Sequence, residues 1–259
     1  FDIGYLRIFP HLVVMAPGDA NDLGAMLEFA VRHDAPCAIR YPKENAADLQ
    51  RELRPIEVGK SEVMTEGDAG AIVCFGAMLA PALEAARRFE EQEGGKLTVV
   101  NARFAKPLDE TLLHRLIRTL PFVVTVEEGN LQGGFGSAVL ESANDARIDA
   151  SRVRRLGLPD RYVEHGERGE LLADLGLDAD GILAACREAA GRAAGVPHVT
   201  APAGFRSPRE RADRERERDR CLTVFPVREA KRIRSLGRSL SSVRCARCCW
   251  APAIGVRNS

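Results

Sequence analysis

Apolar positions along residues 1–193 follow two alternating patterns, which predict an alternation of strands and helices. Short apolar runs suit buried strands, and the stretches after them place apolar residues three and four positions apart, as on one face of a helix. The expected strands cover residues 11–17, 37–42, 69–75, 97–101, 122–126 and 153–156. The expected helices lie near residues 23–31, 78–93, 109–120, 137–144 and 178–194. The pattern therefore predicts an α/β fold with a mostly parallel, helix-flanked sheet.

Local signals mark where these helices begin and end. Asp19 or Asn21 can cap the first helix, because their side-chain oxygens accept hydrogen bonds from free amides. Asp109 or Glu110 can open the third helix, and Ser137 can cap the fourth. A glycine pair is expected to end the second helix.

A glycine-rich loop, GNLQGGFG, joins the strand at 122–126 to the helix that follows it. A strand, a glycine loop and a helix N-terminus can together bind an anion, because the first helical amides lack partners within the helix. The alternative is that the glycines only let the strand and the helix pack closely. The spacing is neither GxGxxG nor GxxxxGK[ST], and this favours the structural interpretation.

Glu127 and Glu128 stand at the end of that strand, where two carboxylates could share a proton. Consecutive strand residues face opposite sides of a sheet, so an acid/base pair is not expected. We predict a structural role instead, such as accepting hydrogen bonds from amides of the loop.

The chain divides by composition into four parts. Residues 1–45 hold a strand–helix–strand unit with parallel strands, and residues 46–55 are polar and read as a linker. Residues 56–193 hold the second α/β series. Residues 194–259 carry 15 Lys and Arg against 6 Asp and Glu and lack an apolar stripe, so a disordered extension is expected.

Cysteines and charge point to no metal, disulfide framework or nucleic acid. Cys245, Cys248 and Cys249 could be half a zinc site, but no second Cys/His pair follows them. The arginines of the tail alternate with acidic residues, and few aromatic residues lie near them. Nucleic-acid binding uses positive charge and aromatic stacking, so it is not expected here. Three further cysteines sit singly in apolar patterns, as reduced cytoplasmic thiols do: Cys37, Cys74 and Cys186.

The formal net charge of the 259 residues is zero and favours no partner. No run of 18 apolar residues and no basic-then-apolar leader occurs, so neither membrane spanning nor secretion is expected. The chain opens at Phe1 in what reads as the middle of a domain, which leads us to expect a piece of a longer protein.

Six stretches occur in a fixed order: FDIGYLR, VVMAPGDANDL, AIRYPKEN, NARFAKPLD, TVEEGNLQGGFGSAV and LGLPDRYVEHG. Together they resemble the 1-deoxy-D-xylulose-5-phosphate synthase family, a group of transketolase-like thiamine diphosphate enzymes. The resemblance covers about residues 1–193. Transketolases and E1β-type subunits share the paired glutamates and the glycine pattern, but not the combination of RFAKPLD with LGLPD.

The resemblance implies a fold and an activity. Residues 1–45 would be the second half of a pyrimidine-binding domain, and residues 56–193 a transketolase C-terminal domain. In the family, pyruvate adds to thiamine diphosphate, loses carbon dioxide and is joined to glyceraldehyde 3-phosphate, at the head of the non-mevalonate isoprenoid pathway and of thiamine biosynthesis. The cofactor serves as the electron sink. The family also implies Mg²⁺, a homodimer and a cytoplasmic location.

The family's diphosphate- and Mg²⁺-binding motif, its activating glutamate and its catalytic histidines lie upstream of the position matched by Phe1. We therefore expect no catalytic, cofactor-binding or metal-binding residue in this chain, and no synthase activity from it alone. His33, His114 and His165 lie in different elements and are expected at the surface or at caps.

One substrate contact is implied by the resemblance. In the family pattern RYPRGN the second arginine helps hold the phosphate of glyceraldehyde 3-phosphate, and Lys43 stands at that position here, followed by Glu44 in place of glycine. Lysine keeps the positive charge but loses the planar bidentate fork. Glu44 could also draw Lys43 away, and a solvated loop lysine is the alternative. Arg103 is expected to tie its loop to the sheet or to face the domain interface.

Two other functions remain open at this stage. The chain could belong to a related thiamine-dependent component, such as a transketolase or an E1β subunit. It could also be a non-catalytic module that binds a partner or an anion through residues 133–137, or that dimerises.

Overall fold

The larger sheet of the computed structural model is built from the β-branched runs of the second α/β series. The structure describes residues 1–52 and 54–195, which belong to one compact unit. The strands of the larger sheet follow the order β3-β5-β4-β7-β8, and β3 alone is antiparallel to its neighbour. Their bounds are Glu62–Thr65 (β3), Ala71–Phe75 (β4), Thr98–Asn101 (β5), Val123–Asn130 (β7) and Val153–Leu158 (β8).

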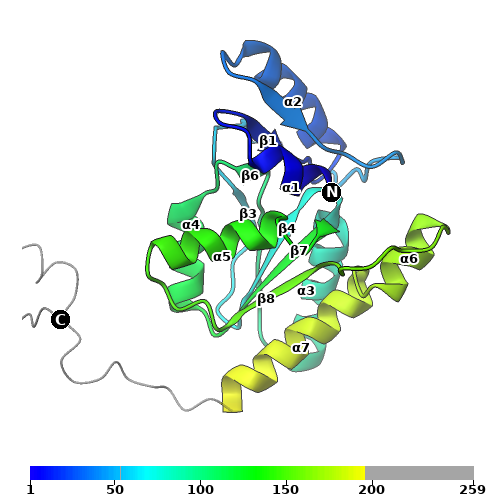
Figure 1. Ribbon diagram of the computed structural model, residues 1–259. Coiled ribbons are helices and arrows are strands. Elements are labelled where there is room, and N and C mark those ends of the chain that lie inside the picture. Colours follow the sequence, from blue (N-terminus) through cyan, green and yellow to red (C-terminus); the bar gives the residue numbers. More distant parts are fainter. Residues whose placement is uncertain (53, 196–259) are drawn as a thin grey trace, which may run out of the picture. The chain divides into compact units, whose positions relative to one another are not determined.

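Helices cover both faces of this sheet, as the alternation of elements predicts (Figure 1). Ile72 and Cys74 of β4 belong to the core shared with α3 (Leu79–Glu93) and α7 (Ala179–Gly195). The alternate residues Val73 and Phe75 belong to the core shared with α4 (Glu110–Thr119) and α5 (Phe135–Asp145). All five β4 residues are buried, because helices cover both faces of the sheet. This explains why the strand is a continuous apolar run without alternating polar residues. This confirms the predicted α/β class with a mostly parallel sheet.

A smaller sheet, in the order β2-β1-β6, joins the two parts of the sequence. β1 (Val13–Met15) and β2 (Cys37–Ile39) are parallel and are connected by α2 (Ala20–Arg32), as expected for a strand–helix–strand unit. β6 (Phe104–Lys106) comes from the second α/β series and pairs antiparallel with β1. The short helix α1 (Asp2–Arg7) precedes β1.

Buried ion pairs tie the two parts together at the N-terminus of α2. Arg103 pairs with Asp22 at 2.9 Å and with Glu62 at 2.7 Å, and all three side chains are almost fully buried. Arg51 adds bonds to Asp19 and to Glu62, each at 2.7 Å. Arg103 thus faces the boundary between the two parts of the chain, as expected. The polar linker at 46–55 contributes Arg51 to the same buried ion network.

Several local expectations are confirmed. Asp19 and Asp109 are the caps of α2 and α4, and their side chains accept hydrogen bonds from the amides three residues on. Gly94 ends α3 in the left-handed conformation, with φ 74°. The expected apolar stripe of α2 is only partly covered, because Met26 is fully buried whereas Val31 is 87 % exposed.

Four elements of the described residues were not predicted from the sequence, and the predictions for the tail lie outside the described residues. β3, β6 and α6 (Arg168–Asp174) are short and lack a strong apolar period, and a 3-10 turn (Gly76–Met78) leads into α3. No helix among residues 1–52 and 54–195 is long and apolar enough to cross a membrane. The expected disorder and cysteine cluster of the tail lie beyond the described residues.

Candidate functional site

The glycine-rich loop after β7 binds a carboxylate of the chain itself. Glu127 is buried, and its Oε2 accepts a hydrogen bond from the Phe135 amide at 2.7 Å. Its Oε1 accepts another from the Gly136 amide at 2.8 Å. These are the first amides of α5, so Glu127 neutralises the positive end of the helix. The predicted structural role of Glu127 is confirmed.

This arrangement removes the anion site that the loop could have formed. The amides that an external phosphate would need, those of Phe135 and Gly136, are already taken by Glu127. A side chain at Gly134 could not be accommodated, because its Cβ would lie 2.3 Å from Oε2 of Glu127. Burial raises the pKa of Glu127, against the opposing effect of the two amide hydrogen bonds.

Ser137 is not the cap that the sequence predicts. α5 begins at Phe135, two residues earlier, and Gly134 is its N-cap. The Ser137 hydroxyl instead donates to the Leu131 carbonyl at 2.7 Å and accepts from Arg155 at 2.8 Å. Ser137 therefore stabilises the glycine loop by joining its start at Leu131 to the first turn of α5. The prediction is wrong because a carboxylate from the preceding strand supplies the cap.

Glu128 points to the other side of β7 and is the centre of a partly buried ion network. Its two oxygens accept from Nε and Nη2 of Arg168 at 2.8 and 2.9 Å. Arg40 adds a third bond through Nη1 at 3.2 Å, and Nη1 of Arg168 reaches Glu44 at 2.9 Å. Burial raises the pKa of Glu128, but the hydrogen bonds and charges of Arg168 and Arg40 outweigh it, so the net pKa is lowered. Glu127 and Glu128 thus have separate partners and form no acid/base pair.

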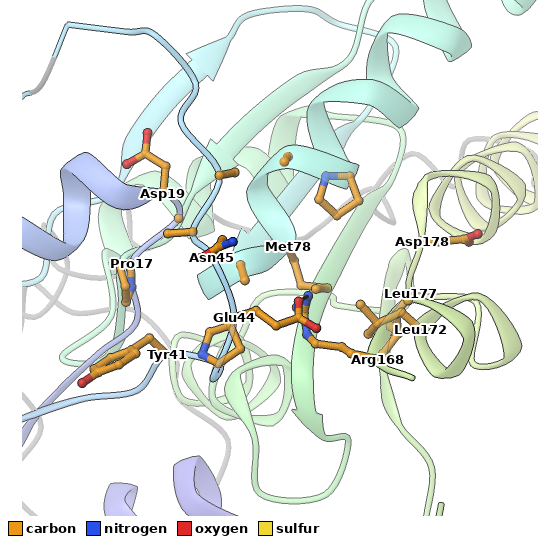
Figure 2. Close-up of a pocket in the computed structure, with 18 of the residues that line it drawn as sticks. Pro17, Asp19, Tyr41, Glu44, Asn45, Met78, Arg168, Leu172, Leu177 and Asp178 are labelled. Atoms are coloured by element: carbon orange, nitrogen blue, oxygen red, sulfur yellow. Dashed lines mark hydrogen bonds and ion pairs between the residues drawn. The ribbon is translucent and has the colours of Figure 1, made fainter. Parts of the chain in front are cut away.

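A pocket of about 320 Å³ lies between the segment at 41–47, the start of α3 and helix α6. Figure 2 shows Glu44 and Arg168 beside each other in this pocket, with Met78 and Leu177 among its apolar side chains. Asn45 also lines the pocket, from the same segment as Glu44. The pocket is thus a mostly apolar space crossed by one ion pair.

Lys43, the residue that the resemblance assigns to substrate phosphate, is exposed on this segment. Among the described residues, the structure gives its ammonium group no ion pair, whereas Glu44 is paired with Arg168. Lys43 does not line the pocket. No local pattern indicates a role for Arg168 or Arg40, because their partners lie far away along the chain.

The histidines and cysteines do not assemble into a site. His114 bonds the Ser142 hydroxyl at 2.8 Å, and His33 stacks on Phe29. Three cysteines are free thiols in the described part of the chain, and burial raises the pKa of Cys74 and of Cys186 to about 12. Residues 1–52 and 54–195 contain no cluster of three His, Cys, Asp or Glu side chains that could hold a metal ion.

Two family models match the chain in the order of its two parts. The transketolase pyrimidine binding domain matches residues 1–48, and the transketolase C-terminal domain matches residues 59–182. Among solved structures, one titled "Split gene transketolase, inactive beta4 tetramer" is 33 % identical, with a TM-score of 0.67 over 73 % of this chain and 61 % of that chain. A transketolase from Pichia stipitis, at 17 % identity and a TM-score of 0.54, shows the same fold.

Curated relatives are more similar in sequence. A 1-deoxy-D-xylulose-5-phosphate synthase of Rhodopirellula baltica is 50 % identical over 190 residues, which is 73 % of this chain and 30 % of that protein. Synthase 1 of Geobacter sulfurreducens is 49 % identical over 199 residues, 76 % of this chain and 31 % of that protein. The chain spans about a third of the length of these relatives. Its two parts thus match the pyrimidine binding domain and the C-terminal domain of the transketolase family, and its curated homologues are 1-deoxy-D-xylulose-5-phosphate synthases.

Proposed function

We propose that this chain is the C-terminal part of a 1-deoxy-D-xylulose-5-phosphate synthase, which joins pyruvate to glyceraldehyde 3-phosphate with loss of carbon dioxide. The observation that carries the proposal is the 50 % identity to a curated synthase over 190 residues, through both matched domains. The proposal includes Mg²⁺, a homodimeric enzyme and a cytoplasmic location, all carried over from the family.

We propose that the described residues carry no binding motif for the diphosphate or the metal of the cofactor. The glycine loop that could have bound a diphosphate is filled by Glu127. We therefore derive no catalytic step from them and propose two supporting roles. The larger sheet and its helices act as a scaffold for the residues at 1–45, and Lys43 attracts the phosphate of glyceraldehyde 3-phosphate.

The fragment proposal is tested with the purified chain. Incubated with thiamine diphosphate, Mg²⁺, pyruvate and glyceraldehyde 3-phosphate, it is expected to form no 1-deoxy-D-xylulose 5-phosphate above the level without protein. Mass spectrometry of the product provides the measurement. Product formation by the chain alone would contradict the proposal.

Lys43 is tested in an active enzyme that contains this chain. Lys43→Ala removes one charge-assisted contact to the phosphate, so KM for glyceraldehyde 3-phosphate is expected to rise about tenfold while KM for pyruvate stays unchanged. Steady-state kinetics with each substrate varied in turn measures the two constants. Lys60→Ala, an exposed lysine outside this segment, is the matched control. Equal changes for both substrates would remove Lys43 from the phosphate role.

A transketolase activity is the second candidate, because both reported structural neighbours are transketolases. Donor choice distinguishes the two functions in the same active enzyme. A synthase uses pyruvate and releases carbon dioxide, whereas a transketolase transfers a two-carbon unit from a ketose phosphate. The chain is 33 % identical to the split-gene transketolase but 50 % identical to the curated synthase of Rhodopirellula baltica. This difference favours the synthase function.

A further inference from the structure

The segment at 41–46, which carries Lys43, has little support of its own. It contains no helix or strand and is largely exposed. Its flanks are held by backbone hydrogen bonds, one from the Arg40 amide to the Met15 carbonyl and one from the Ala20 amide to the Ala47 carbonyl, both at 2.9 Å. Between them the segment borders the pocket, so apolar packing does not fix its middle.

Arg168 supplies the missing support from the other part of the chain. Its Nη1 donates to Glu44 at 2.9 Å, in the middle of the segment, and its Nε and Nη2 donate to both oxygens of Glu128 at 2.8 and 2.9 Å. This uses the planar fork of the guanidinium on one carboxylate and its remaining nitrogen on the other. Arg168 therefore connects the segment to strand β7.

Glu128 is the centre of the network. It lies on β7 directly after Glu127, the last residue that pairs with β4, and within the stretch where the register with β8 shifts. It also accepts a bond from Arg40, the residue immediately before the segment. The Glu128 carboxylate thus restrains the segment at its start directly and at its middle through Arg168.

The direction of the Glu44 side chain has a consequence for Lys43. The two residues are neighbours in sequence, and a released Glu44 carboxylate would compete with a substrate phosphate for the Lys43 ammonium group. In the structure Glu44 is engaged by Arg168 instead. The glutamate that could have drawn Lys43 away is thus bound by Arg168.

We propose that Arg168 is a positioning residue for phosphate binding: it fixes the segment at 41–46 and holds the Glu44 carboxylate away from Lys43. This inference rests on the phosphate role proposed for Lys43. In this proposal the C-terminal domain, which contains Arg168, takes part in recognising the phosphorylated substrate.

The first experiment measures mobility and phosphate affinity on the full 259-residue chain. Backbone ¹⁵N relaxation reports the order of residues 41–47, and titration with glycerol 3-phosphate, followed through the amide shift of Lys43, reports affinity. In Arg168→Met the order parameters are expected to fall and the dissociation constant to rise three- to tenfold. Arg168→Lys keeps the positive charge but lacks the planar guanidinium fork. Its order parameters and dissociation constant are expected to lie between those of the parent chain and Arg168→Met.

Arg187→Met is the matched control, because Arg187 of α7 also pairs with a carboxylate, Glu93 at 2.7 Å, away from the segment. It is expected to leave both readouts unchanged. Unchanged order or unchanged affinity in Arg168→Met would overturn the positioning role. Lys43→Ala separates the two proposals: if it retains full affinity, the phosphate role of Lys43 itself fails.

A double variant tests the part of the proposal that concerns charge. If Arg168→Met weakens binding because Glu44 is released toward Lys43, then Arg168→Met with Glu44→Gln is expected to regain most of the lost affinity. The single variant Glu44→Gln should bind phosphate at least as tightly as the double. A double variant as weak as Arg168→Met would overturn this part.

Discussion

At the residue scale, the Glu127 carboxylate determines the role of the glycine loop, because it caps α5. A carboxylate aimed at two buried helical amides stabilises the loop and excludes an external anion at the same place. The spacing of the glycines could not reveal this, because an anion-binding loop and a loop filled by its own carboxylate require the same small residues. Only the direction of the side chain distinguishes them.

Glu127→Ala is expected to lower the free energy of unfolding by about 1–3 kcal/mol, because two buried amides lose their acceptor. Urea unfolding monitored by circular dichroism measures the loss. Glu110→Ala, an exposed acid in the first turn of α4, is the control and should cost less. Sulfate is expected to stabilise Glu127→Ala more than the parent chain, since the vacated amides can then bind it. Equal stabilisation by sulfate would contradict the capping role.

The pH dependence of the Arg168 network follows from Glu128. Its pKa in the folded chain is lowered, so the ionised form is favoured by folding, and the stabilisation is complete above the ordinary value near 4.5. It is lost as the pH falls through the lowered pKa. A carboxyl ¹³C titration of Glu128 is therefore expected to show a midpoint below 4.5 that rises in Arg168→Met. A midpoint unmoved by that substitution would show that Arg168 does not stabilise the charge.

At the element scale, the sequence predicts best where a signal is local. The caps Asp19 and Asp109 and the end of α3 at Gly94 each depend on neighbours within four residues, and all three are confirmed. β6 has only three residues, and its partner β1 lies about 90 positions away, so no local period indicates it. The contacts of Arg168 span 40 and 124 positions, and they escape for the same reason.

Helix α2 offers a test of how much of its apolar stripe contributes to stability. Met26 is fully buried against β1 and β6, so Met26→Ala is expected to cost about 2–5 kcal/mol. Val31 is 87 % exposed, and Val31→Thr should change stability by less than about 0.5 kcal/mol. Chemical denaturation of the two variants gives the comparison. A large cost at Val31 would show that another surface covers this face of α2 in solution.

At the scale of the whole molecule, the two matched domains are joined by more than a linker. They share the smaller sheet through β1 and β6, and Arg103 is buried between Asp22 of α2 and Glu62 of β3. Removing one partner of a buried ion pair leaves an uncompensated charge, which costs more than the pair contributes. We therefore expect residues 1–45 to unfold together with the larger sheet, even though the sequence reads them as separate parts.

Hydrogen exchange with mass spectrometry tests this coupling. In the parent chain, the amides of β1 and of β4 are expected to exchange by openings of similar free energy. Asp22→Ala leaves Arg103 without one carboxylate and is expected to lower protection in β1 by about 3–5 kcal/mol, and protection in β4 by less. Glu28→Ala, which breaks an exposed pair on the same helix, is the control and should leave both strands unchanged. Separate exchange of β1 in the parent chain would show that the buried network does not couple the two parts. Common exchange that becomes separate only in Asp22→Ala would identify the buried network around Arg103 as the coupling between residues 1–45 and the larger sheet.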